Sequence, residues 1–504
     1  MTSRRLAIAP LSALLWALLL AAAPAAADDP AAAYPNFSAD VNLQALYVTQ
    51  DNFRVESGIF GRSLTPQTGN FNSQIGTNEN YFNVLETQFR LMLTGRFTEH
   101  IASRFTIEVN PSQAREQGFG DPSANVTINN AEVLRLKNYY LEGEHDLGGI
   151  LGWRIGRQNF DTPHALVVGQ ADADGLALWW RGAEFGKLRG EAAALDFDGT
   201  SEIEDVYAAL AYEFPKHPDY HGSLYLSSLS FRDITAGPGN APPEISLGGT
   251  SAIGAWLTGP STTTAASLSH GHLFWAGGEF CYDEQGLKVD ANAVMNFGSL
   301  SPGRGSQAQI DNVQGYLAML DAGYGRSFWR FGAAGAFVTG HDPRPQAKRY
   351  TGFLDIKANF DFTRFFFDGG PYLAATGFTS PAVQGSGFFG GKFYAEFTPL
   401  DWLAINLQAA ALAAQYSRPQ FANNLVVPPI PYASVAQDAG RYYGTEVDFW
   451  LEFTPVKRLT WLAEVDYFQP GNYFKGPATN EKNPTGFLAK PDPAWRFAGG
   501  LLFR

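Results

Sequence analysis

The chain has 504 residues, a formal net charge of −13 and a single cysteine, Cys281. One cysteine excludes a disulfide framework, a cysteine-based zinc site and the attachment of c-type haem. Acidic residues outnumber lysine and arginine by 49 to 36, so there is no basic surplus to neutralise phosphates, and we expect no nucleic-acid partner.

Residues 1–27 match the pattern of a secretory signal peptide. Two arginines precede an apolar core at Leu11 to Ala23, and the small residues Ala25 to Ala27 form a cleavage site. The alternative is an N-terminal membrane anchor, but the apolar run is shorter than the ~20 residues that a spanning helix needs. We therefore expect a mature chain, residues 28–504, that forms one domain in a bacterial envelope.

Alternation of apolar and polar residues with a period of two recurs through the rest of the chain and predicts β-strands. In chain order, the clearest predicted strands cover residues 38–47, 85–97, 101–110, 287–297, 354–362, 445–453 and 461–467. Short turns are predicted at 98–100, 283–286, 398–401 and 454–457, and long polar connections at about 49–83, 111–130, 233–266, 299–310, 418–440 and 470–492. Such alternation of short and long connections is typical of an up-and-down membrane barrel with long extracellular loops.

Charged residues recur in the middle of the predicted strands, for example Arg90, Arg104 and Asp290. In a closed membrane barrel this face of each strand meets an aqueous lumen, and the opposite face meets lipid. Aromatic pairs near strand ends, such as Trp179-Trp180 and Tyr442-Tyr443, are typical of interfacial girdles. We expect an all-β, transmembrane, antiparallel up-and-down β-barrel of roughly 16–20 strands, since about twenty candidate strands can be counted. A secreted soluble β protein with aromatic carbohydrate-binding platforms is the alternative.

Several segments resemble known outer-membrane families. Tyr139 to Glu142, followed by Trp153 to Gln158, resembles the strand–turn–strand with a Gly-Arg-Gln ending that is found in porin-type barrels. Together with Ala173 to Leu176, Gly444 to Asp448 and Tyr467 to Phe474, it resembles the alginate export family. This resemblance implies a barrel of about 18 strands, fewer than the tally of candidates. It also implies a passive channel in the bacterial outer membrane that conducts or exports an anionic polysaccharide such as alginate.

The implied passage of a polyanion requires a basic lining that binds weakly enough for release. Strand parity, the odd or even position of a residue in the alternation, places most candidates on the polar face. Arg135 and Lys137 share one parity, but the pattern does not decide whether it is the polar or the apolar face. Arg154 and Arg157 have opposite parity, and the motif favours Arg157. The predicted pore-lining residues are Arg90, Arg96, Arg104, Arg135, Lys137, Arg157, Lys288, Lys357, Glu446 and Asp448. A structural network of ion pairs in the lumen is the alternative role for each of these charges.

The sequence lacks the motifs of common enzyme classes. There is no G-x-S-x-G nucleophile elbow and no P-loop, and the pair His270 and His272 lacks further ligands at metal-binding spacing. We expect no catalytic residue, no metal and no cofactor. The expected partners are outer-membrane lipid, a polar or anionic solute, and the barrel-insertion machinery, since Trp495 to Arg504 resembles a terminal insertion signal. A docking barrel that sheathes an electron conduit or secretion component, or an envelope hydrolase on a barrel, remains the alternative.

Overall fold

The computed structural model describes residues 34–51, 81–109, 134–168, 171–182, 184–195, 205–236, 247–248, 266–302, 310–341, 349–356, 358, 360–367, 381, 386–416, 440–474 and 493–503. In these residues no helix has the length and apolar character that crossing a membrane requires. The predicted signal peptide lies outside them, as do most residues of the predicted long connections.

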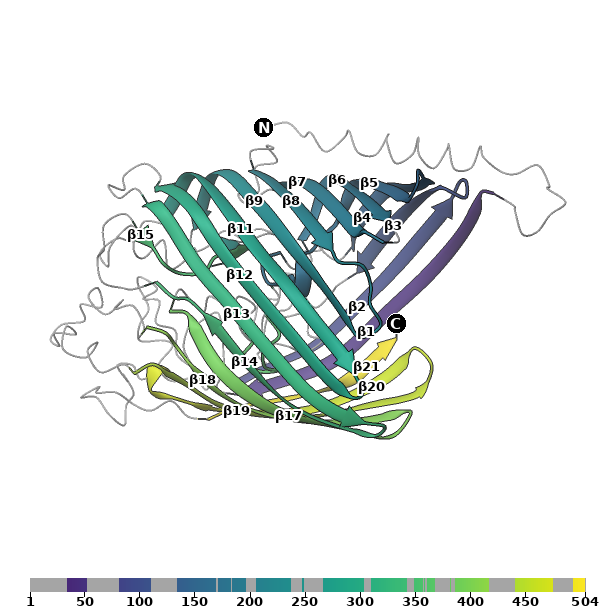
Figure 1. Ribbon diagram of the computed structural model, residues 1–504. Helices are drawn as coiled ribbons and strands as arrows, with labels where there is room; N and C mark the ends of the chain where they lie inside the picture. The colour runs from purple at the N-terminus through teal and green to yellow at the C-terminus, as the bar shows by residue number, and fades with distance from the viewer. Residues whose placement is uncertain are drawn as a thin grey trace.

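The described strands form one large antiparallel sheet that closes on itself (Figure 1). Nineteen described strands share the sheet, but β15 (Arg349–Tyr350) is a two-residue strand that only extends it, so the barrel wall has 18 strands. The wall strands are β1 Asn36–Asp51, β2 Tyr81–Arg96, β3 Ile101–Val109, β4 Leu134–Asp146, β5 Ile150–Phe160, β6 Ala171–Gly182, β7 Gly186–Leu195, β8 Asp205–Glu213, β9 Tyr220–Ala236, β11 Ala266–Glu284, β12 Leu287–Pro302, β13 Ile310–Arg326, β14 Trp329–Val338, β17 Phe388–Leu400, β18 Leu403–Ala413, β19 Tyr442–Val456, β20 Leu459–Pro470 and β21 Ala494–Phe503.

The first and last strands close the barrel. β1 pairs with β21 in a register that runs from Leu43 opposite Phe503 to Asp51 opposite Trp495. Closure leaves no strand edge with unpaired backbone groups, which is the condition for a sheet in lipid. The predicted fold class and the predicted strand number are therefore confirmed.

Along the wall strands the outer face is predominantly apolar, and the inner face carries most of the polar groups. In β20, Trp461 and Val465 are exposed. Glu464 and Asp466, on either side of Val465 in the sequence, are buried. The exposed large side chains of the wall are predominantly Leu, Phe, Tyr, Trp and Val. An exposed apolar outer face costs free energy in water but not in hydrocarbon, so the alternation is consistent with a membrane barrel.

Short turns join the strands at one end of the barrel, as the sequence predicts. β11 and β12 are joined by Gln285 and Gly286, whose φ angles are 52° and 89°. Positive φ at both positions is the signature of a type I′ turn, which matches the twist of the flanking strands. Six of the seven predicted strands lie in β1, β2, β3, β12, β19 and β20.

The seventh predicted strand, 354–362, is not part of the wall. Only β16 (Asp355–Ile356) forms there, and it pairs with β10 (Leu247–Gly248) in a separate two-stranded sheet. The side chains of Leu354, Ile356, Phe360 and Phe362 are all at most 2% exposed, and Asp355 is as buried as they are. The segment is thus enclosed on all sides, so its alternation does not separate a lipid face from a water face.

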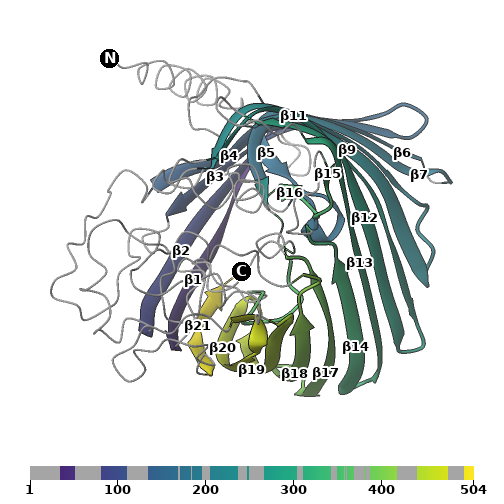
Figure 2. The same cartoon turned by 90° about the vertical axis from the view of Figure 1, so that its left-hand side faces the viewer.

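This enclosed segment folds into the barrel. We call residues 351–367, which follow β15 and precede β17, the inner segment; within it, residues 357 and 359 lie outside the described residues. Figure 2 shows β16 within the ring of wall strands, whereas β15 extends the wall sheet beside β13. The inner segment contacts wall strands on two different sides, and these contacts form the site described next.

Candidate functional site in the barrel lumen

On one side the inner segment is held by β11 and β12. The indole N–H of Trp275 donates a hydrogen bond to the carbonyl of Leu354 at 2.7 Å, and the backbone N–H of Leu354 donates to Asn296 Oδ1 at 3.3 Å. Trp275 and Asn296 are both fully buried on the inner face of the wall. Because buried polar groups need partners, these two side chains fix the position of the segment as well as their own.

A second in-folded segment meets the inner segment. The connection from β5 to β6 passes through the 3₁₀ turn Pro163–Ala165, and Val168 forms a parallel bridge with Ile356. The N–H of Ile356 donates to the carbonyl of Val167 at 2.6 Å. The Thr162 hydroxyl accepts hydrogen bonds from the N–H groups of Val167 and Val168 at 3.1 and 3.0 Å, which keeps this turn tight.

On the other side of the lumen, four carboxylates lie on two adjacent strands. Glu446 and Asp448 of β19 and Glu464 and Asp466 of β20 occupy alternate inner positions and are at most 2% exposed. Asp448 and Asp466 are direct neighbours in the strand register. Four buried carboxylates this close repel one another and lose hydration, so they require compensating donors and positive charge.

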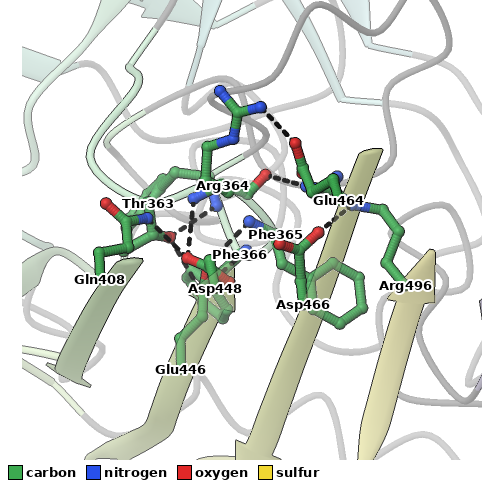
Figure 3. A network of polar contacts seen from close by, with 11 residues as sticks. Thr363, Arg364, Phe365, Phe366, Gln408, Glu446, Asp448, Glu464, Asp466 and Arg496 are labelled. Carbon is green, nitrogen blue, oxygen red and sulfur yellow. Dashed lines mark hydrogen bonds and ion pairs between the residues drawn. The ribbon is translucent and has the colours of Figure 1, made fainter. Parts of the chain in front are cut away.

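The tip of the inner segment supplies the donors (Figure 3). Glu446 accepts three hydrogen bonds from it: from the Thr363 hydroxyl at 2.9 Å, from the Phe365 N–H at 2.7 Å and from the Phe366 N–H at 3.0 Å. The Arg364 N–H donates to Asp448 at 3.4 Å, and Gln408 Nε2 donates to the same carboxylate oxygen at 2.6 Å. The Glu446 carboxylate therefore binds mainly the backbone of the inner segment.

Two guanidinium groups complete the contact. Arg364 forms an ion pair with Glu464, and its guanidinium lies 4.5 Å from the centre of the Trp450 ring. Arg496 of β21 is fully buried; its Nε lies 2.7 Å from Asp466 and its Nη2 lies 2.9 Å from Glu464. The same Nη2 donates to the carbonyl of Arg364. We call the two arginines and four carboxylates the docking cluster, because together they hold the tip of the inner segment.

Aromatic packing reinforces the docking cluster. Phe366 stacks on Phe468 of β20 with ring centres 5.3 Å apart and lies 5.2 Å from the Tyr443 ring. Phe367 packs edge-on against Phe388 at 4.7 Å. These rings are all at most 1% exposed, so the inner segment shares a dry core with the wall and occupies lumen space that a solute would otherwise fill.

The predicted lining residues Arg90 and Arg104 lie on the inner face and form ion pairs. Arg90 Nε is 2.5 Å from Glu108, and Arg104 Nε is 2.8 Å from Glu142. Lys137 Nζ also approaches Glu108, at 3.5 Å, and lies at a register shift between β3 and β4. Ion pairing of these charges agrees with the alternative of a lumen network of ion pairs.

The structure places Arg154, rather than the favoured Arg157, in the lumen. Arg154 Nη2 lies 3.1 Å from Glu142, on the inner face. Arg157 shares the face of Ile155, which is 54% exposed on the outer wall, and its Nη1 lies 4.0 Å from Asp174. The motif match therefore identified the right strand but favoured the arginine on the wrong face.

The remaining predicted residues have varied positions. Lys288 lies on the inner face of β12 with its Nζ 3.2 Å from Asp290, and Arg96 is exposed at the end of β2. Arg135 is opposite Glu108 in the strand register, whereas Lys357 lies outside the described residues. Glu446 and Asp448 face inward as predicted, but they contact the inner segment and not open lumen.

The sequence analysis missed Arg364 and Arg496. Arg496 has a signal in the sequence, since it alternates with Trp495 and Phe497 in the last strand and so falls on the inner face. Arg364 has none, because it lies outside any alternating stretch of the wall. In the same core, burial raises the pKa of the Tyr350 hydroxyl, and the nearby charge of Asp355 raises it further. The described residues contain no cluster of three potential metal ligands.

Together, the closed sheet, the apolar outer face and the in-folded segment define a wide antiparallel β-barrel with a constricted lumen. No family model and no curated protein matches the chain. Among solved structures, OccK9 (OpdG) of Pseudomonas aeruginosa is similar at 11% identity and a TM-score of 0.52, over 93% of this chain and 98% of that one. OpdL and the outer membrane protein OpdK of the same organism match at 11% and 9% identity, each with a TM-score of 0.48 and the same coverage. The likeness to OccK9 shows the fold of this chain.

Proposed function

We propose that this chain is a passive channel of the bacterial outer membrane that conducts small polar solutes carrying negative charge. Its closed wall presents apolar side chains outward and charged side chains inward, which is the arrangement required to surround water within lipid. Passage needs no energy source, because the solute follows its own gradient through an aqueous path.

The single observation that carries the anion preference is the relative exposure within three lumen ion pairs, on β2 to β4 and on β12. The Arg90 side chain is 28% exposed and its partner Glu108 is 0% exposed. Arg104 and Glu142 are 48% and 17% exposed, and Lys288 and Asp290 are 38% and 18% exposed. In each of these three pairs the cation reaches into the lumen and the carboxylate stays at the wall. A solute therefore meets positive charge first, and ion pairing keeps its binding weak enough for release.

The buried acids do not reverse this preference. Glu446, Asp448, Glu464 and Asp466 are almost fully buried, and they are compensated by the two arginines and the backbone donors of the docking cluster. Charges at a solvated surface act on a passing solute more than charges that are already neutralised by close partners. The formal net charge of −13 therefore does not describe the path.

The in-folded segments favour small solutes over a polymer. The inner segment is fixed to β11 and β12 on one side and to β19–β21 on the other, so it crosses the lumen. An anionic polysaccharide such as alginate shares the charge that the path prefers, but its passage requires this segment to move. A docking barrel also fits less well, because the lumen already holds the chain's own segment.

Liposome swelling tests the proposal. Proteoliposomes with the purified barrel should swell faster in a monosaccharide uronate than in the neutral sugar of the same size, and the rate should fall steeply with oligouronate length. The variant R90A/R104A should lose the charge preference and keep neutral-sugar permeation. Equal rates for uronate and neutral sugar would contradict the anion preference, and undiminished swelling with long oligouronates would favour polysaccharide passage.

A further inference from the structure

The outer wall carries a groove that the channel function does not use. It lies over β13, β14, β17 and β18, has a volume of about 650 Å³ and is almost entirely apolar. Its floor includes Gly335, Gly391 and Ala411, which are direct neighbours across three strands. Phe337 and Phe389 stand at its sides and are 40% and 47% exposed.

The fold itself does not require the glycines of the floor. A Cβ atom on Gly335 would come no closer than 3.8 Å to another atom, and one on Gly391 no closer than 3.7 Å. Neither residue has a positive φ angle. Glycine weakens a strand relative to a residue with a side chain. No steric contact requires glycine at these two opposed positions, and the effect of the missing side chains is the groove.

Positive charge flanks the end of the groove next to the long connections. β15 pairs with Asn312 and Val313 of β13 beyond the end of β14, so Arg349 lies above the groove. Arg349 is exposed, and its Nη2 lies 2.9 Å from Gln314 Oε1. Arg441 is exposed directly before Tyr442, a residue of the groove lining. The two arginines are three strand spacings apart across the sheet, roughly 14 Å, and about five residues apart along the strands, roughly 17 Å.

We propose that this groove binds one phosphorylated, multiply acylated lipid of the outer leaflet. An acyl chain lies over Gly335 and Gly391, and the phosphate groups are bound near Arg349 and Arg441. The inference rests on the proposed placement of the barrel in the outer membrane with its long connections outside. A second copy of the chain fits less well, because two copies in one membrane orientation bring the same arginines together at one level.

Native mass spectrometry of the detergent-purified full-length barrel tests the site, with diphosphorylated hexa-acyl lipid A as probe and its dephosphorylated form for comparison. The wild type should retain the phosphorylated probe preferentially. The double variant R349A/R441A should bind it at least twentyfold more weakly, about fivefold for each arginine near a phosphate-bearing surface. The filled variant G391V should lose the acyl contact and bind both probes more weakly.

Two controls match these variants. The control for G391V is G190V, which adds the same side chain on β7, where a Cβ meets no atom within 4 Å. The control for R349A/R441A is R326A, which removes an exposed arginine at the other end of β13. Both control variants should bind the probe like the wild type. Equal binding of the two probes, unchanged binding by R349A/R441A, or dimers that G391V dissociates would overturn the proposal. Conductance of the same preparations separates the proposed lipid site from the proposed channel. If only the lipid site is wrong, the channel still conducts; if the channel is wrong, no conductance is measured even without lipid A.

Discussion

Replacing Glu446 by alanine should release the tip of the inner segment. The substitution removes an acceptor of three hydrogen bonds, from Thr363, Phe365 and Phe366, at 2.7–3.0 Å. Hydrogen bonds to a charged group contribute about 1.5–3 kcal/mol each, and breaking a buried charged network costs about 3–5 kcal/mol. A loss of about 4 kcal/mol reduces the ratio of docked to undocked segment roughly a thousandfold.

Single-channel recording in planar bilayers measures this release. E446A should give a larger mean conductance and frequent transitions between levels, because the undocked tip leaves and re-enters the lumen. The barrel wall keeps its strand pairing, so the variant should still insert. E213A is the matched control: Glu213 pairs with Lys187 at 2.7 Å on the wall but is 46% exposed, and such pairs contribute about 0–1 kcal/mol. A properly inserted E446A channel with wild-type conductance and wild-type noise would refute the reasoning.

Three further outcomes follow from the same contacts. R496A leaves the buried Asp466 without a guanidinium and removes one of the two that compensate Glu464. It should therefore reproduce the E446A recordings and lower stability by about 3–5 kcal/mol in urea unfolding, and wild-type stability would contradict this. G286A should destabilise the barrel by about 1–3 kcal/mol, because the φ angle of Gly286 is 89° and a Cβ there would lie 2.1 Å from the Gly325 carbonyl oxygen. The control G190A should change stability by less than about 0.5 kcal/mol, since a Cβ there meets open space. R104A should lower the anion-to-cation permeability ratio in bilayer recordings, and an unchanged ratio would count against this arginine as part of the path.

The sequence predicts the wall well, because the wall depends on a local rule. In β20 the alternation of Trp461, Glu464, Val465 and Asp466 is imposed by lipid on one face and the lumen on the other. The same rule explains the failure at 354–362. A segment enclosed within the lumen can also alternate, and nothing local distinguishes Phe360 in a dry core from a phenylalanine that faces lipid.

The candidate site is predictable only in part. Parity correctly placed Glu446 and Asp448 on the inner face, but their partners lie about eighty residues away in the chain, in a segment whose path depends on the whole barrel. Arg157 was favoured over Arg154 on the strength of a motif, although parity with the outward Ile155 already argued against it. Strand parity therefore predicts which face a side chain occupies, and only the folded connections determine what it contacts there.

The reversal potential of the purified mature chain in a planar bilayer, under a tenfold gradient of potassium chloride, tests the central claim most directly. We predict stepwise insertion of open channels and a reversal potential whose sign indicates chloride as the preferred ion. A membrane that stays non-conducting in the presence of folded barrel, or a reversal potential of the opposite sign, would contradict a water-filled path bordered by exposed arginine and lysine.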